Sequence, residues 1–475
     1  MTTNEPNHNA IYVPKTASRR DFLRGTVLAG AGAASQAWAA GGSGGNDIKI
    51  GLIGCGGRGS GACGQALSSG NYNFKLWAMG DIHADRLASS FNNLSKAHKD
   101  QVDVADSRKF IGLDAYEKVL KECDLVILAT PPGFRPYHFE AAVNAGKNIF
   151  MEKPVATDAP GVRKVLEMAK IADQKGLHVV AGLQRRYQNC YREALKQVKE
   201  NNIIGDIVSG FVYWDSAGVW VKEREQGQSE LEYQLLNWYY FNWLCGDHIN
   251  EQHIHNIDVA NWFIGSHPIS AQGMGGRQVR GGNNLPQVYA EEIAKGPEAV
   301  LKRIKADNKF GEIYDHHFVE FTYANGVRVS SQCRHQPKCI NPVREEFVGT
   351  KGILYLDNSG RCYANDYKGE TIWRYRPTGP DRKDPDPYQV EHNELQDAIL
   401  NGKKINNAYY VAESTMTCIL GRMASYSGKD VKWDDAIASQ IQLMPNKVTK
   451  DTVPPSAPDA LGFYPVAIPG VTKVV

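Results

Sequence analysis

The sequence predicts an α/β protein in which a doubly wound parallel sheet is followed by an α+β domain with an open, mostly antiparallel sheet. As far as residue 151, short apolar runs alternate with helix-length segments, which is typical of parallel sheets with helical crossovers. Between residues 317 and 376, short turns separate strand-like runs, which indicates consecutive hairpins. The 475 residues have room for roughly two to four domains of about 150 residues each.

The composition is that of a packed globular protein and argues against two classes of partner. Apolar residues make up 42% of the chain and charged residues 22%, as in ordinary domains. The formal charge is +2, and the first forty residues account for it with four basic and two acidic side chains. Because nucleic-acid binding depends on basic side chains, no nucleic-acid partner is expected. No apolar run reaches the roughly 20 residues that cross a bilayer, so no membrane span is expected either.

Residues 1–39 have the order of features found in an export signal. A Ser-Arg-Arg-Asp-Phe-Leu motif at residues 18–23 is followed by an uncharged, Ala- and Gly-rich stretch and by Ala37-Trp38-Ala39, a small-x-small cleavage pattern. We therefore predict a twin-arginine signal peptide and a periplasmic or other extracytoplasmic location. Cleavage of the peptide and its retention as an anchor both stay open.

A glycine-rich loop lies between the first predicted strand, residues 47–53, and a helix over residues 60–68. Its sequence is G-x-G-x-x-G, in which the first glycine permits a tight turn, the second lets backbone approach a pyrophosphate, and the third lets helix and strand pack closely. The helix N-terminus then faces the phosphate charge. This pattern predicts a Rossmann domain over residues 47–187 and five cofactor-binding residues: Gly54, Gly56, Gly57, Arg58 and Gly59.

The second predicted strand, residues 74–79, leads to Asp81, about 20 residues after the glycine loop. An acidic side chain at this place accepts hydrogen bonds from the ribose hydroxyls and repels a 2′-phosphate. Asp81 therefore favours NAD over NADP as the cofactor.

The alternation then continues to the end of the nucleotide-binding domain. Loops that follow parallel strands meet at one edge of the sheet, so the loops at 130–134 and 152–154 should border the same crevice. This adds four predicted cofactor-binding residues: Thr130, Pro131, Glu152 and Lys153. The predicted elements are helices over 84–97, 114–122 and 137–145 and strands over 125–129 and 148–151.

A second domain is predicted over residues 188–450, with an extended, proline-rich arm over 451–475. Residues 208–214 alternate like a strand, and Asn325-Gly326 between two strand-like runs favours a type I′ hairpin turn. Further predicted elements are hairpins over 347–356 and 361–376 and helices over 391–400 and 408–425.

Four motifs together resemble the glucose-fructose oxidoreductase / inositol dehydrogenase / MocA (Gfo/Idh/MocA) family. They are Glu152-Lys153-Pro154, Ala-Gly-Leu-Gln-Arg-Arg-Tyr at 181–187, His-Asn-Ile-Asp at 255–258, and Gly-Thr-Lys-Gly at 349–352. The resemblance spans nearly all of residues 47–430. It implies an oxidoreductase with a tightly bound nicotinamide cofactor that forms a homo-oligomer through its open sheet.

The sequence departs from the family pattern at two positions. The family commonly has a histidine near position 135, where this chain has Arg135. It also commonly has an aspartate four residues before the catalytic histidine, where this chain has Glu251. Both departures keep open the alternative of a sugar-binding or scaffold protein that retains the fold without catalytic activity.

A predicted helix from about Asp247 to Phe263 presents Glu251, His255 and Asp258 on one face, at i, i+4 and i+7. His255 is the candidate general base, because its ordinary pKa of about 6.5 suits proton abstraction near neutral pH. Lys153 would hydrogen-bond the same substrate oxygen, and Glu251 or Asp258 would orient the imidazole. The predicted catalytic residues are therefore Lys153, His255 and Glu251.

Further candidates surround this predicted centre. Arg185 and Arg186 suit the substrate and the pyrophosphate respectively, or a surface ion pair. Aromatic residues at 238–243 suit sugar faces, or core and oligomer packing. His248, Glu251 and His255 have a spacing that could share a metal ion, but no metal is predicted. The predicted substrate-binding residues are Arg185, Tyr187, Asp258 and Trp243, and Arg186 is assigned to the cofactor.

These features predict an exported, NAD-dependent oxidoreductase that acts by hydride transfer on a secondary alcohol of a sugar, polyol or glycoside. One alternative is a redox-neutral, glycoside-cleaving enzyme that recycles a bound NAD. A further alternative is a sugar-binding protein without catalytic activity on the same fold.

Overall fold

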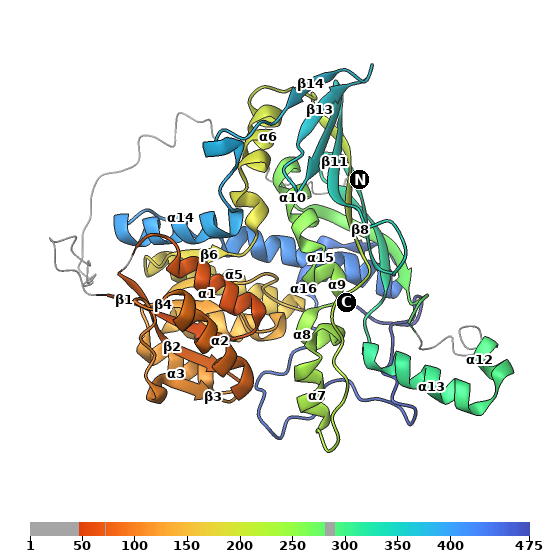
Figure 1. Ribbon diagram of the computed structural model, residues 1–475. Coiled ribbons are helices and arrows are strands. Elements are labelled where there is room, and N and C mark those ends of the chain that lie inside the picture. The colour runs from red at the N-terminus through yellow and green to blue at the C-terminus, as the bar shows by residue number, and fades with distance from the viewer. Residues whose placement is uncertain (1–46, 72, 281–289) are drawn as a thin grey trace, which may run out of the picture. The chain divides into compact units, whose positions relative to one another are not determined.

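Six parallel strands form the N-terminal sheet of the computed structural model, which describes residues 47–71, 73–280 and 290–475. The strand order is β3-β2-β1-β4-β5-β6, so the order in which strands are added to the sheet reverses between β1 and β4 (Figure 1). In sheets of this type the ligand crevice lies at that reversal. The predicted signal peptide, residues 1–39, lies outside the described residues. The strands are β1 Ile48–Ile53, β2 Phe74–Asp81, β3 Lys109–Ile111, β4 Leu125–Leu128, β5 Asn148–Met151 and β6 Val179–Ala181.

Helices cover both faces of this sheet, because successive side chains of each strand point to opposite sides. Ile50 and Leu52 of β1 pack into one buried cluster, and Ile53 packs into another. The first cluster includes residues of α1 and α2, and the second includes residues of α3, α4 and α5. The predicted doubly wound α/β domain is confirmed. The helices are α1 Gly57–Leu67, α2 Ala84–Ala97, α3 Ala115–Glu122, α4 Arg135–Asn144 and α5 Ala159–Gln174.

Nine strands form the second sheet, in the order β14-β13-β12-β11-β7-β10-β9-β8-β15. Within the described ranges all pairs of neighbours are antiparallel except β7 and β10, so the prediction of an open, mostly antiparallel sheet is confirmed. The strands are β7 Ile207–Ser216, β8 Pro268–Gly276, β9 His316–Tyr323, β10 Arg328–His335, β11 Val343–Gly349, β12 Gly352–Asp357, β13 Tyr363–Asp366, β14 Thr371–Arg374 and β15 Val431–Lys432.

One hairpin turn differs from the sequence prediction. A type I′ turn requires positive φ at both central residues, but at Asn325-Gly326 only Gly326 has it, with φ +85°. The Gly326 N–H donates to the carbonyl of Tyr323 at 3.0 Å, so the glycine is the last residue of the turn. The predicted type I′ turn is therefore wrong, although the hairpin itself forms between β9 and β10.

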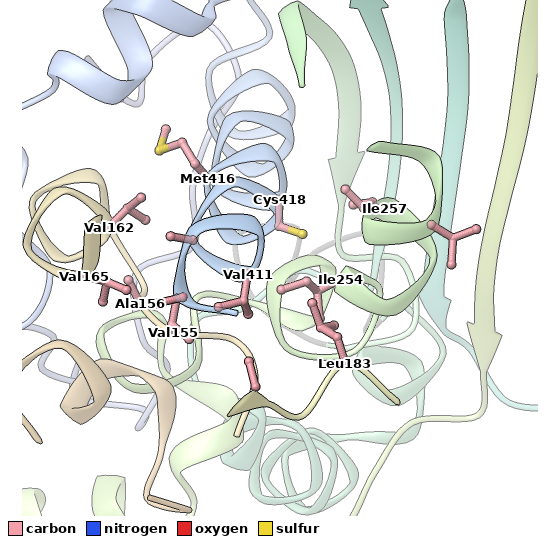
Figure 2. Packing of buried hydrophobic residues seen from close by; sticks show 14 of the residues in the cluster. Val155, Ala156, Val162, Val165, Leu183, Ile254, Ile257, Val411, Met416 and Cys418 are labelled. Carbon is pink, nitrogen blue, oxygen red and sulfur yellow. The ribbon is translucent and has the colours of Figure 1, made fainter. Parts of the chain in front are cut away.

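Two long C-terminal helices return to the nucleotide-binding domain. Helix α14 (Pro387–Asn401) packs on α1, and α15 (Ala408–Ser427) packs on both α5 and β8 (Figure 1). Figure 2 shows Val165 of α5, Val411 of α15 and Ile257 of α10 (Ile254–Ile264) in one buried cluster. The two sheets therefore share a continuous core. No helix among the described residues is both long enough and apolar enough to cross a membrane.

The remaining helices connect these layers or lie on their surface. They are α6 Asn189–Lys199, α7 Glu230–Leu236, α8 Asn242–Cys245, α9 His248–Glu251, α12 Ala290–Lys295, α13 Pro297–Asp307 and α16 Trp433–Ala438.

Candidate active site

A cleft of about 1000 Å³ opens where β1, β2 and β4 end. Its position follows from the sheet topology, because the loops after these parallel strands converge at the reversal of strand order. Eight of the predicted cofactor-binding residues line it: Gly54, Gly56, Gly57, Arg58, Gly59, Asp81, Thr130 and Pro131.

The glycine loop has the shape that a pyrophosphate requires. Gly54 has φ +93°, and a Cβ on Gly59 would lie 1.9 Å from the Gly54 carbonyl oxygen, so both positions need glycine for the turn and for helix packing. A Cβ on Gly56 or Gly57 would meet no atom within 4 Å, so this part of the loop is open. Helix α1 also has no acidic residue in its first turn. The loop therefore fits the diphosphate of a dinucleotide.

Asp81 closes the other side of the loop. Its Oδ2 accepts a hydrogen bond from the Cys55 backbone N–H at 2.6 Å, and its Oδ1 accepts one from the His83 N–H at 2.8 Å. Because each carboxylate oxygen has a second lone pair, the side chain is held in place and can still accept hydrogen bonds from ribose hydroxyls.

Arg58 and Glu152 join the glycine loop to the loop after β5. The Arg58 Nε lies 2.5 Å from Glu152 Oε1, and a second guanidinium nitrogen lies 3.6 Å from Glu391 Oε1. Burial and the like charge of Glu152 raise the pKa of Glu391 well above its ordinary value. Sequence analysis missed Glu391, because it belongs to α14, more than 300 residues from the glycine loop.

Arg135, which stands where the family commonly has histidine, is fully buried and bridges two loops of the crevice. Its Nε donates to the Glu152 carbonyl at 3.0 Å and its Nη2 to the Thr130 carbonyl at 2.6 Å. One helical turn later, His138 lies 3.1 Å from Thr130 Oγ1 and lines the cleft. Burial, together with Arg135, lowers the pKa of His138 to about 3. Sequence analysis missed this neutral histidine, although His138 lies within the helix predicted over 137–145, just after the loop at 130–134 that was expected to border the crevice.

The structure brings Lys153 and Glu251 together. The Lys153 ammonium lies 3.1 Å from Glu251 Oε1 and also donates to the Glu251 backbone carbonyl. Only 13% and 14% of the two side chains is exposed. Burial raises the pKa of Glu251, and Lys153 opposes this shift. Glu251 thus contacts the predicted catalytic lysine, whereas sequence analysis expected it to contact His255.

The predicted helix over 247–263 is interrupted, which corrects the sequence prediction. Helix α9 ends at Glu251 and α10 begins at Ile254. Between them the His253 N–H bonds to the His248 carbonyl, five residues back, at 3.2 Å. This wider turn is of the π type, which is frequent at functional sites. Glu251 and His255 therefore lie on separate helices and not one above the other on a single face.

His255 is a buried, neutral imidazole in cationic surroundings. Its ring stacks on Trp214 of β7 with 5.6 Å between the centroids, and 6% of the residue is exposed. Burial first, then the charges of Lys153 and Arg185, lower its pKa well below the ordinary value. Within the described part of the chain, its Nδ1 has no hydrogen-bond partner. The ring is therefore neutral and can act as a proton acceptor.

Two further predicted residues, Arg186 and Asp258, are paired with each other. Arg186 donates two hydrogen bonds of 2.9 Å to the fully buried Asp258 carboxylate, which also accepts one from Ser414 Oγ at 2.8 Å. This network ties α10 to α15. In this structure Asp258 therefore stabilises the domain instead of orienting His255, and neither residue lines the cleft.

Arg185 is buried near His255 and is paired on one side only. Its Nη1 donates to Glu345, which also accepts hydrogen bonds from Asn256 at 2.7 Å and Tyr191 at 2.8 Å. The Nε and Nη2 atoms of Arg185 have no partner within the described residues. These donors fit its predicted role in holding a polar substrate.

Two of the predicted substrate-binding residues belong to the core. Trp243 is 1% exposed and donates its indole N–H to Gln234 at 2.7 Å. Tyr187 is 3% exposed and donates to Asn407 at 2.5 Å. Neither residue lines the cleft. Of the two roles considered for the aromatic residues at 238–243, Trp243 therefore has the role in core packing.

The three candidate metal ligands considered in the sequence analysis do not form one site among the described residues. They are His248, Glu251 and His255. His248 contacts Asp247 through Nδ1 at 2.8 Å, while Glu251 contacts Lys153. Asp247, His248 and His317 do have ligand atoms within 4.8 Å of one another. Asp247 already accepts hydrogen bonds from the Tyr314 N–H at 3.0 Å and the Tyr426 hydroxyl at 2.5 Å.

Residues 48–183 match the GFO_IDH_MocA family model, described as an oxidoreductase family with an NAD-binding Rossmann fold. The chain is 30% identical to an inositol 2-dehydrogenase of Azotobacter vinelandii over 340 residues, covering 69% of this chain and 89% of that protein. It belongs to the Gfo/Idh/MocA family. It is therefore an NAD-binding oxidoreductase of this family.

Solved Gfo/Idh/MocA-like structures share the fold. An aldose-aldose oxidoreductase from Caulobacter crescentus, complexed with glycerol, superposes with a TM-score of 0.60 at 15% identity, covering 82% of this chain and 100% of that chain. A levoglucosan dehydrogenase in complex with NADH and levoglucosan gives a TM-score of 0.57 at 15% identity, covering 82% and 99%. The predicted Gfo/Idh/MocA fold is thus confirmed.

Proposed function

We propose that this protein is an exported, NAD-dependent dehydrogenase of a sugar, polyol or glycoside, with Lys153 and His255 at its reacting centre. The observation that supports this most directly is the buried His255 imidazole, neutral and unpaired at Nδ1, close to the Lys153–Glu251 pair. A neutral base and a cationic hydrogen-bond donor are the two groups that oxidation of an alcohol requires.

The protein's own groups handle the proton. The His255 imidazole accepts the proton of the substrate hydroxyl, while the Lys153 ammonium donates a hydrogen bond to the same oxygen and stabilises its developing negative charge. The glycine loop and Asp81 would hold NAD, which would supply the hydride acceptor, so oxidation of the carbinol would leave a ketone, NADH and one proton on His255. Glu251 holds the ammonium in place through their ion pair.

The cofactor is NAD in this proposal. Asp81 stands at the end of β2 and lines the cleft beside the glycine loop, where the Cys55 and His83 backbone N–H groups hold its carboxylate. A 2′-phosphate at that place would meet the carboxylate charge. We expect calorimetry to show tighter binding of NAD than of NADP.

The substrate class and the location rest on separate support. The matched relatives are an inositol 2-dehydrogenase and a levoglucosan dehydrogenase, which favours a ring with several hydroxyls. The twin-arginine motif at residues 18–23 favours export. Buried, unpaired donors on Arg185 are also suited to a hydroxyl-rich ligand.

A second candidate is a redox-neutral glycoside-cleaving enzyme, favoured by the same export motif, because free NAD is scarce outside the cytoplasm. Oxidation of one ring carbon to a ketone acidifies the neighbouring C–H, loss of that proton expels the glycosidic oxygen as an alcohol, and the ketone then takes the hydride back. Release of alcohol from labelled glycosides without added NAD would identify this reaction.

The proposal is tested with a panel of inositols, aldoses and glycosides, following NADH formation. We expect turnover by the wild type and its loss in Lys153→Met and His255→Asn, with NAD binding retained in both. Lys164→Met is a matched control, because Lys164 pairs with Glu140 on the surface of α4 and α5. NAD binding without turnover or cleavage of any tested sugar or glycoside would favour a sugar-binding protein.

A further inference from the structure

The cofactor cleft has a second wall that the glycine loop does not provide. Besides the nucleotide-binding loops, the cleft is lined by Trp220, Lys222, Leu235 and Trp238. These residues belong to the segment that runs from the end of β7 to α8, in the second domain. They are not among the residues that the sequence motifs assign to the cofactor.

Hydrogen bonds hold this wall in shape. The Tyr240 hydroxyl donates to the Val219 carbonyl at 3.1 Å, and the Lys222 backbone N–H donates to Asn237 Oδ1 at 3.0 Å. Asn237 is fully buried and also donates to the Lys309 carbonyl at 2.8 Å. The wall is therefore pre-organised, which lowers the entropic cost of binding a ligand against it.

The surface of the wall is aromatic and cationic. The Trp220 and Trp238 rings meet edge to face with 5.8 Å between the centroids. Trp220 is 42% exposed although it is a large apolar side chain, and the Lys222 side chain is also exposed. An exposed indole beside an ammonium, inside a cleft, is suited to a ligand with flat rings and negative charge.

We propose that Trp220, Lys222 and Trp238 bind the dinucleotide against the glycine loop and retain it between catalytic cycles, an inference that rests on the proposed NAD-dependent function. The indoles pack on the flat faces of the cofactor, and Lys222 contributes positive charge toward its pyrophosphate. The sugar is the less suitable occupant, because this wall shares the cleft with Gly56 and Asp81, whereas Lys153 and His255 do not line it.

The test measures cofactor retention directly, in the full chain. Protein loaded with NADH is mixed with excess NAD, and the loss of nicotinamide fluorescence gives the dissociation rate. Because stacking on an aromatic side chain changes binding by roughly 10- to 100-fold per ring, we expect Trp220→Ala to release NADH about 10- to 100-fold faster. Lys222→Ala should also release it faster, with a weaker dependence on salt than the wild type.

Two controls keep the result interpretable. Trp373→Ala removes an indole from β14, which lines a different pocket, and should release NADH at the wild-type rate. Trp220→Phe keeps an aromatic face and should lie between the wild type and Trp220→Ala. Trp220 and Lys222 are both exposed, so we expect their variants to unfold at the same temperature as the wild type.

The possible failures are distinguishable. Wild-type release of NADH from both Trp220→Ala and Lys222→Ala would overturn the proposed wall while leaving the NAD-dependent function intact. An increase in KM for the sugar with unchanged release would assign the wall to the substrate and would also overturn the proposal. Failure of the wild-type chain to bind NADH would overturn the proposed function itself.

Discussion

The charged groups around His255 determine the protonation state of its imidazole. Most histidines next to a carboxylate have a raised pKa, but the nearest charged groups here are cationic, and burial adds to their effect. The ring is therefore neutral at physiological pH and becomes charged only when it takes the substrate proton. Glu251, one helix earlier, acts on Lys153 and not on this ring.

The pH dependence of turnover follows from this environment. Since protonation removes the base, and since its pKa is well below about 6.5, the acidic limb of kcat/KM in the wild type should lie below the ordinary histidine range. Lys153→Met removes a positive neighbour, which stabilises the imidazolium and raises its pKa. The limb of the residual activity should then move to higher pH, and an unchanged limb would exclude His255 as the titrating base.

Glu251→Gln tests the carboxylate alone. Glutamine preserves size and hydrogen bonding but leaves Lys153 without its counter-charge, so turnover should fall about 10- to 1000-fold. NAD affinity should be nearly unchanged, because Glu251 does not line the cofactor cleft. Steady-state kinetics and calorimetry measure both quantities. Glu140→Gln, at the half-exposed pair with Lys164, is the matched control and should behave as the wild type does.

Among the elements, the parts of the fold that depend on local pattern were predictable. Helix α2 has the predicted bounds of Ala84–Ala97, because its apolar period lies entirely within its own sequence. The interruption between α9 and α10 was not predictable. At the interruption Gln252 and His253 hydrogen-bond to His335 and Ser331 of β10, each at 2.8 Å, and these partners are far away in the sequence.

The same distinction holds for the candidate site. The glycine loop, Asp81 and Thr130 gather because parallel strands bring their ends to one edge, and that rule can be applied to a sequence. Glu391, Trp220 and Lys222 arrive from the second domain without a motif. Their position at the cofactor site depends on how the two domains pack against each other. The periodicity of the sequence gives no information about that packing.

The buried Arg186–Asp258 ion pair should contribute to the stability of the packing between α10 and α15. Asp258→Asn leaves a mostly buried guanidinium without a counter-charge, so the free energy of unfolding should fall by about 3–5 kcal/mol. Urea unfolding of the wild type and the variant measures this change. Asp114→Asn breaks an exposed ion pair with Lys118 and should have little effect. Equal stability of the two variants would contradict the structural role assigned to Asp258.

At the scale of the whole molecule, the proposed export and the proposed cofactor use are linked. A dehydrogenase that works outside the cytoplasm must fold around its cofactor first, and the twin-arginine route carries folded proteins. Replacing Arg19 and Arg20 by lysines should leave the protein in the cytoplasm with its cofactor bound. Cell fractionation with antibody detection measures this, and an unchanged distribution would contradict the predicted signal.

Helices α14 and α15 determine which residues a cofactor-binding unit needs if it is to fold when transferred to another protein. Leu395 of α14 completes the apolar layer on one side of the first sheet, and Val411 of α15 completes the layer on the other side. A chimera that borrows only residues 47–187 would leave both layers open to water. A transplantable cofactor-binding unit must therefore be discontinuous and include residues 387–427, and exchange of second domains between relatives is possible only outside that pair of helices.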